Sequence, residues 1–309
     1  MNSNWTQYGI VLITAGLLPL VGCGGGGSTT SDETGLLSLA VSDGPIHDAK
    51  KVCITFDEIE FKHGSEAPFV VELDSAEKVN LLDFQGNNAA PLLFNEELPA
   101  GNYQWLRLGV DASLGSNGGA GDTNGDDCDG EGSYIVMNDE TVHNLYVPSG
   151  AETGLKLVSG FTVPVNGSAD FTAEFDLGKS ITAPPGLQPD VILKPAIRLV
   201  NNVHAGTLTG QVSDELATVD ACEASVYVFD DGVTPNGIED GGDDPNDPVA
   251  TAMLEELDNA GIAEYHYTVG FLLAGDYEVA FTCDGAEFVP EEGKSATIEA
   301  QMLTTVDFP

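Results

Sequence analysis

Apolar and polar residues alternate along most of the chain from residue 36 onwards, and clusters of Gly, Pro, Asn and Asp interrupt the alternation. Successive side chains of a β-strand point to opposite faces, so a period of two is typical of strands with one buried face. Turn residues between such runs indicate antiparallel strands. In the first part of the chain the pattern predicts strands at residues 36–43, 51–61, 69–73, 102–111, 133–138, 155–165, 169–177 and 191–200.

A second series of alternating segments begins after His204-Ala205-Gly206. Only two segments, 83–94 and 253–260, have a pattern that also suits a helix, and neither is longer than about two turns. We therefore predict an all-β protein with two β-sandwich domains in tandem, residues 36–204 and 205–309. The strands predicted in the second domain are residues 207–213, 224–230, 264–271, 276–283, 295–302 and 304–309.

The N-terminal segment differs from the rest because residues 1–22 contain no Asp, Glu, Lys or Arg. Its uncharged, mostly apolar run from Gly9 to Gly22 is shorter than the roughly 20 residues that a membrane-spanning helix needs, which is typical of a signal peptide. The run ends in Leu20-Val21-Gly22-Cys23, which resembles the lipobox of bacterial lipoproteins, although no basic residue precedes it. The resemblance implies cleavage before Cys23 and acylation of this cysteine, for example with palmitate. The alternative is a plain secretory signal with a free Cys23.

This reading divides the N-terminus into a lipoprotein signal peptide, residues 1–22, and a lipidated Cys23 on a Gly/Ser tether, residues 23–35. Gly24 follows the cysteine, where Asp is associated with retention in the inner membrane. We therefore expect a lipid anchor in the outer membrane of a Gram-negative cell.

The composition is that of a folded protein with an extreme charge. Apolar residues make up 42% of the chain and charged residues 19%, while 50 acidic residues against 10 basic ones give a net charge of −40. Such a chain repels phosphate backbones, so we expect no nucleic-acid partner. The same acidity could equally be an adaptation to a salty habitat.

Four cysteines follow Cys23, and an even number in an exported chain favours disulfides over metal binding or thiol chemistry. Three pairings are possible. Pairing within each half, Cys53 with Cys128 and Cys222 with Cys283, needs no link between domains. Strand parity supports the second pair, because both of its cysteines fall on the apolar faces of predicted strands.

Two loops are rich in acidic side chains, and the first of them alternates oxygen ligands as loops that bind hard cations do. Its candidate ligands for Ca²⁺ are Asp122, Asn124, Asp126 and Asp129, although the spacing is not that of an EF-hand. The second loop, Asp230 to Pro248, contains six Asp, one Glu and no basic residue. A solvated loop without a bound ion is the alternative for each. We expect no other cofactor.

The sequence lacks the motifs of the common hydrolases, since G-x-S-x-G and H-E-x-x-H are both absent. Gly178-Lys179-Ser180 is similar to the end of a phosphate-binding loop, but Ala173 stands where that loop needs Gly. We therefore expect that the protein is not an enzyme.

Several stretches of the first domain resemble an uncharacterised domain of bacterial lipoproteins, domain of unknown function 4382, over residues 36 to about 203. They are LAVSDGPI, VCITFDEIEF, LLDF, LPAGNYQWLRLGV, LYVPSG, GLKLVSGFTV, FDLGKSI and ILKPAIRLV. The resemblance implies a fold and a location but no reaction. The second domain, through GTLTGQV, ASVYVFD and LLAGDYEVAF, resembles the carboxypeptidase-regulatory and carbohydrate-binding-like β-sandwiches, which include sugar binders and structural spacers.

Together these features predict a non-enzymatic outer-membrane lipoprotein that binds a glycan or another envelope protein. The alternative is a passive envelope or matrix component without a discrete ligand. The ligand-binding residues are unknown from the sequence. Tyr265 and Tyr267 share a strand face and are the nearest candidates for stacking on a sugar, although packing in the core is the simpler use of both.

Overall fold

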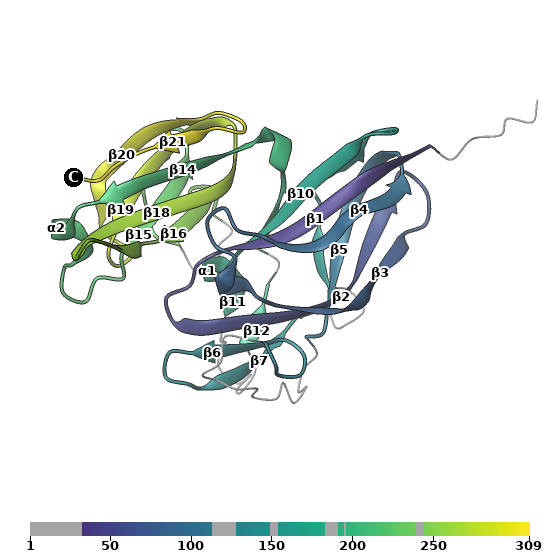
Figure 1. The fold of residues 1–309 in the computed structure, drawn as a ribbon, viewed down its shortest axis with the longest axis horizontal. Coiled ribbons are helices and arrows are strands. Elements are labelled where there is room, and N and C mark those ends of the chain that lie inside the picture. The colour runs from purple at the N-terminus through teal and green to yellow at the C-terminus, as the bar shows by residue number, and fades with distance from the viewer. Residues whose placement is uncertain (1–32, 113–127, 149–153, 183–190, 195, 239–243) are drawn as a thin grey trace, which may run out of the picture. The chain divides into compact units, whose positions relative to one another are not determined.

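The computed structural model describes residues 33–112, 128–148, 154–182, 191–194, 196–238 and 244–309. Residues Asp32–Pro309 form one compact unit built of strands and turns (Figure 1). The prediction of an all-β protein is confirmed. The described residues include four short helical turns: η1 (Leu81–Asp83), α1 (Leu177–Ser180), η2 (Asn202–His204) and α2 (Asp214–Ala217).

Residues 34–201 build two sheets. The first has the strand order β13-β10-β1-β4, and the second has the order β11-β12-β7-β6-β2-β5-β8, with β3 beside β2 and β9 beside β5. The strands of the first sheet are β1 (Thr34–Gly44), β4 (Ala90–Pro99), β10 (Ser168–Asp176) and β13 (Ile197–Asn201). Those of the second are β2 (Ala49–His63), β3 (Phe69–Asn80), β5 (Gly101–Val110), β6 (Tyr134–Met137), β7 (Val142–Tyr146), β8 (Leu155–Leu157), β9 (Phe161–Val163), β11 (Ile181–Thr182) and β12 (Val191–Leu193).

The apolar residues of these alternating strands form one core. Leu37, Leu39 and Val41 of β1 are buried at successive odd positions, and Ile59 and Phe61 of β2 belong to the same cluster. Burial of this shared apolar surface is the main force that holds the two sheets together.

Residues 205–309 build two further sheets, with the strand orders β17-β18-β14-β21 and β16-β15-β19-β20. They enclose a second core that includes Leu208, Val226, Tyr267, Val279 and Phe308. The strands are β14 (Ala205–Val212), β15 (Ser225–Asp230), β16 (Ala250–Met253), β17 (Glu255–Asn259), β18 (Ile262–Leu273), β19 (Gly275–Thr282), β20 (Phe288–Ile298) and β21 (Leu303–Thr305).

Neither of the two segments with a helix-compatible pattern forms a helix beyond the end of η1, and both contain strand residues. Asp83 ends the turn η1, and strand β4 begins at Ala90 and pairs with β1. Strand β17 pairs with β18 along its whole length, from Glu255 to Asn259. Pairing with a long neighbouring strand satisfies the backbone of these segments, which overrides their weak local preference for helix.

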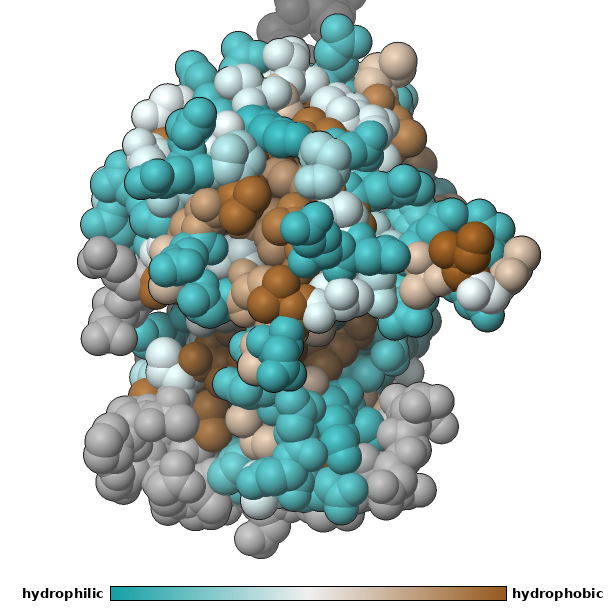
Figure 2. All heavy atoms as spheres, turned by 90° about the vertical axis from the view of Figure 1, so that its left-hand side faces the viewer, coloured by the Kyte–Doolittle hydropathy of each residue, from teal (hydrophilic) through white to brown (hydrophobic). Residues whose placement is uncertain are grey.

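Figure 2 shows one face of the molecule, on which hydrophilic residues predominate and hydrophobic ones lie in small groups between them. This agrees with the excess of acidic residues in the sequence. No helix among the described residues is both long and apolar enough to cross a membrane.

Candidate functional site

A cluster of charged side chains lies where strands β1 and β10 end and strand β13 begins. Strands β1 and β10 are parallel, and their register places Asp43 opposite Phe175 and Gly44 opposite Asp176. Strand β13 runs antiparallel on the other side of β10 and places Arg198 opposite Glu174. Residues far apart in the sequence therefore meet at one edge of the first sheet.

Two basic side chains neutralise part of this cluster. The Arg198 guanidinium forms an ion pair with the Glu174 carboxylate. The ammonium group of Lys179, on helix α1, lies 3.6 Å from Oδ2 of Asp176 and donates a hydrogen bond of 2.6 Å to the carbonyl of Pro248. Oδ1 of Asp176 caps α1 by accepting from the backbone N–H of Lys179 at 3.1 Å.

The third carboxyl group, that of Asp43, is only 3% exposed. Within the described part of the chain, neither of its oxygens has a hydrogen-bond partner of normal geometry. Burial raises its pKa well above the usual range, the charges of Asp176 and Glu174 raise it further, and only the backbone N–H of Leu177 acts to lower it. This carboxyl group therefore favours its neutral form.

Burial also raises the pKa of the Glu174 carboxyl group to about 7. The Arg198 guanidinium opposes this effect without cancelling it, and Asp176 adds to it. Burial raises the pKa of Asp176 as well, against the opposing charge of Lys179. Three neighbouring carboxyl groups can thus hold protons at a pH where exposed ones are ionised.

A cavity of about 310 Å³ opens in front of this cluster. Its charged wall consists of Glu174, Asp176, Lys179, Arg198, Asp244 and Asp247, and apolar side chains such as Phe175, Ile197 and Val249 complete it. In the described ranges no set of His, Cys, Asp or Glu side chains is placed to hold a metal ion. The cavity has room for a small polar ligand. The cations of the cluster already have protein partners, so their ion pairs can also stabilise the fold without any ligand.

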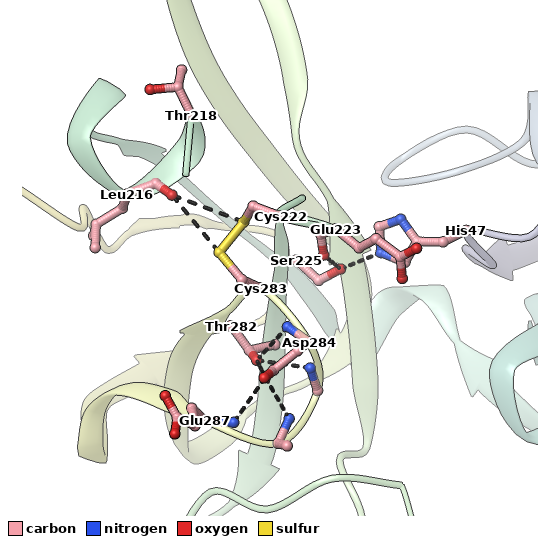
Figure 3. The surroundings of a disulfide bond; sticks show 12 residues. His47, Leu216, Thr218, Cys222, Glu223, Ser225, Thr282, Cys283, Asp284 and Glu287 are labelled. Carbon is pink, nitrogen blue, oxygen red and sulfur yellow. Dashed lines mark hydrogen bonds between the residues drawn. A yellow bond between two sulfur atoms is a disulfide. The ribbon is translucent and has the colours of Figure 1, made fainter. Parts of the chain in front are cut away.

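The structure joins Cys53 to Cys128 and Cys222 to Cys283, which are the pairs predicted from the sequence. Their Cα atoms are 5.7 and 4.5 Å apart. Figure 3 shows the second disulfide between the turn after α2 and the end of β19, with the carbonyl of Leu216 3.9 Å from each sulfur.

A hydroxyl–imidazole pair lies near this disulfide, and sequence reasoning missed it. Nε2 of His47 is 2.6 Å from Oγ of Ser225, as Figure 3 shows. Burial lowers the pKa of His47, and the charge of Glu223 acts in the opposite direction. Ser225 is 4% exposed, so its hydroxyl is shielded from solvent and from any bulky substrate. The two residues are 178 positions apart, and no local motif signals their contact.

Of the remaining predicted site residues, the structure describes only Asp129. Cys23, Asp122, Asn124 and Asp126 lie outside the described residues, so the predicted lipidation and Ca²⁺ sites remain predictions. Asp129 is described, next to the disulfide-bonded Cys128.

The two tyrosines suggested for sugar stacking pack with the core of residues 205–309. Tyr267 is 1% exposed and donates a hydrogen bond of 2.6 Å to the carbonyl of Val306. Tyr265 is partly buried against the same cluster. They are not an exposed platform.

Residues 34–195, just over half of the chain, match the family "Domain of unknown function (DUF4382)", and the chain belongs to this family. Three stretches of the family resemblance, around Asp43, Phe84 and Asp176, meet at the charged cluster. Strand pairing brings Gly44 opposite Asp176, and Oγ of Ser42 donates a hydrogen bond of 2.9 Å to the carbonyl of Phe84. No curated protein matches the chain.

Three solved structures match the chain at low identity and low TM-score. The minor pilin GBS52 of Streptococcus agalactiae has 13% identity and a TM-score of 0.20 over 88% of this chain and 94% of that chain. The fimbrial anchor protein Mfa2 of Porphyromonas gingivalis has 10% identity and a TM-score of 0.20 over 85% and 82%.

The Bacillus anthracis TIE protein has 11% identity and a TM-score of 0.19 over 89% of this chain but only 34% of its own length. This chain therefore spans about a third of that protein. Scores this low say nothing about the function of this chain.

Proposed function

We propose that the protein is an exported, lipid-anchored module of the cell envelope that binds a surface partner, a glycan or another envelope protein, without catalysing a reaction. The two disulfides are the observation that carries this proposal. Disulfides persist in oxidising compartments outside the cytosol, which agrees with a signal peptide before Cys23.

The anchor is tested by labelling cells with palmitate. We expect label in the wild-type protein and none in Cys23→Ser, because the acyl chains need the cysteine that follows the signal peptide. Cys53→Ser is the matched control, since it removes a cysteine but leaves the lipobox intact, and it should be labelled like the wild type. Equal labelling of Cys23→Ser and the wild type would contradict the lipid anchor.

A passive envelope component is the second candidate. The observation that favours it is that Lys179 and Arg198, which line the charged cavity, are engaged by Pro248, Asp176 and Glu174. The Lys179–Pro248 hydrogen bond ties the segment before β16 to helix α1, and the Arg198–Glu174 ion pair ties β13 to β10, so these contacts stabilise the fold without a ligand. Screening the detergent-solubilised full chain against a glycan array and envelope extracts distinguishes the two candidates. A binding module captures a glycan or an envelope protein, whereas a passive component captures neither.

A further inference from the structure

We propose that the protein binds an uncharged, N-acetylated glycan in a groove between the loop of residues 85–88 and strands β14, β18 and β21, which lie in one sheet (Figure 1). This inference rests on the proposed function, since it names the class of the surface partner. The groove has a volume of about 370 Å³, which is within the usual range of small-ligand pockets. Its walls include Asn87, Thr207, Phe271, Gln301, Met302 and Leu303, and it is called the Phe271 groove below.

Phe271 has a backbone conformation that its side chain disfavours. The register between β14 and β18 shifts at this point, so that Gly270 and Phe271 together lie opposite the single residue Thr207. The φ angle of Phe271 is +52°, which strains a residue with a bulky side chain. A glycine would adopt this angle without strain. Strained residues that persist in a fold cluster at binding sites, which directs attention to the phenyl ring.

The phenyl ring of Phe271 lines the groove instead of packing in a core. It is partly buried and, within the ranges that the structure describes, belongs to none of the hydrophobic clusters. No cation and no second aromatic ring lies over it in these ranges. Met302 and Leu303, which are 56% and 63% exposed, extend the apolar surface beside it.

Two side-chain amides of the groove are held by the protein, and each keeps one group free. Oδ1 of Asn87 accepts a hydrogen bond of 2.8 Å from Oγ1 of Thr207. Nε2 of Gln301 donates one of 2.7 Å to the carbonyl of Asn202. Nδ2 of Asn87 and Oε1 of Gln301 have no partner among the described residues. The groove therefore offers a ligand one donor and one acceptor that are already ordered.

A close contact between two glycines brings Asn87 to the groove. A Cβ atom at Gly270 would lie 2.2 Å from the carbonyl oxygen of Gly86 and 2.7 Å from Oδ1 of Asn87. The loop of residues 85–88 can therefore pack directly on strand β18 only because residue 270 has no side chain. Asn87 and Thr207 are 120 positions apart, so no local motif signals this groove.

Charge excludes two classes of ligand. In the described part of the chain the lining of the groove contains no charged residue, although the sequence has 50 acidic residues. Asp170 lies at its margin and accepts a hydrogen bond of 3.2 Å from Nδ2 of Asn202, while Asp83 and Glu255 line a separate cavity. The net charge of −40 repels an anionic ligand, and a cationic one finds no carboxylate in the wall.

An acetamido sugar is an uncharged ligand that can use all of these groups. Its carbonyl can accept from Nδ2 of Asn87, its N–H can donate to Oε1 of Gln301, and its pyranose ring has a C–H face for Phe271. A plain hexose has hydroxyl groups for the two amides but no methyl group for Met302 and Leu303. A protein partner covers about 20–30 residues on each side of a stable interface, whereas nine residues line the groove.

The test is calorimetric titration of the full chain, in a detergent without a sugar head group, with chitotetraose, the tetramer of N-acetylglucosamine. The comparison probes are cellotetraose, which has hydroxyl groups in place of the acetamido groups, and the deacetylated, cationic tetramer. At about 1 M salt, where charges are screened beyond about 3 Å, we expect both to bind at least tenfold more weakly than chitotetraose.

Two variants distinguish a binding site from a structural contact. Asn87→Asp keeps the oxygen that accepts from Thr207 but removes the free donor, so it should bind chitotetraose at least tenfold more weakly with an unchanged thermal midpoint. Phe271→Gly removes the ring and relieves the strained φ angle, so it should weaken binding as much without lowering the midpoint.

The matched control is Asn88→Asp, which makes the same change at the next position of the loop. Asn88 is exposed and lines the separate cavity, so this variant should bind like the wild type. Absence of chitotetraose binding, equal binding of either comparison probe, or equal weakening by Asn88→Asp would overturn the proposal. Undiminished binding or a clearly lower midpoint in Phe271→Gly would overturn it as well, because the ring would then serve the fold.

Capture of an envelope protein that Phe271→Gly abolishes, without any binding of chitotetraose, would assign the groove to a protein partner instead. Palmitate labelling does not involve the groove. A labelled wild-type chain that does not bind chitotetraose would therefore leave the proposed envelope function standing and refute only the N-acetylated glycan.

Discussion

At the scale of single residues, Glu174 is the group with the clearest chemical consequence. Its carboxyl group has an ordinary pKa of 4.5, which burial raises to about 7 in the folded chain. Between these two values the folded chain holds a proton that the unfolded chain has released. The free energy of unfolding therefore falls as the pH rises through this range, by about 3 kcal/mol for this group.

We predict that thermal melts give a higher midpoint at pH 5 than at pH 7.5, and that Glu174→Gln reduces this difference because its amide does not titrate. Glu140→Gln is the matched control, since Glu140 lies in an exposed ion pair with Lys50. It should respond to pH like the wild type. The same pH response in Glu174→Gln and the wild type would contradict the raised pKa.

At the scale of the elements, strand β14 depends on a glycine that lets another segment approach closely. A Cβ atom at Gly210 would lie 1.8 Å from the carbonyl oxygen of Val306 and 2.8 Å from the ring of Tyr267. This carbonyl accepts the hydrogen bond of the buried Tyr267 hydroxyl. The methyl group of an alanine would therefore push apart a strand and the segment that closes the second core.

We predict that Gly210→Ala lowers the free energy of unfolding by about 1–3 kcal/mol, the usual cost of overpacking a core. Urea unfolding of the full chain measures it. Gly275→Ala is the control on strand β19, because no atom lies closer than 3.7 Å to its added Cβ. Equal midpoints for the two variants would refute the steric argument.

At the scale of the whole molecule, the net charge of −40 has two competing explanations, bulk adaptation to salt and cation binding by the acidic loops. Screening depends on ionic strength and treats Ca²⁺ and Mg²⁺ nearly alike. A loop of flexible carboxylates prefers the larger ion. At a tenfold excess over its Kd, a bound ion stabilises the fold by RT ln 11, about 1.4 kcal/mol.

We predict a larger thermal shift with Ca²⁺ than with Mg²⁺ at matched ionic strength. The double variant Asp126→Asn with Asp129→Asn should lose the difference, while Glu255→Gln with Glu256→Gln, two exposed residues of strand β17, controls for the loss of two charges. Equal shifts with both ions in the wild type would show that the first loop is a solvated acidic turn.

Local patterns in the sequence were sufficient to predict most strands and the cysteine pairs. Alternation acts over a few residues, so it shows directly which side of a strand is apolar, as at Leu37, Leu39 and Val41. The parity of Cys222 and Cys283 within their segments likewise placed both on apolar faces, and the structure joins them.

The candidate sites were decided by tertiary structure. Asp43 meets Asp176 only because β1 and β10 pair in parallel, and His47 meets Ser225 only across 178 residues. Trp105 shows the same limit at short range. It lies two residues after the buried Tyr103, but a β-bulge at Gln104 on strand β5 turns it away from the core. Alternation determines faces within a strand, but register, bulges and distant partners depend on which strands pair, and the packing of the whole chain decides that.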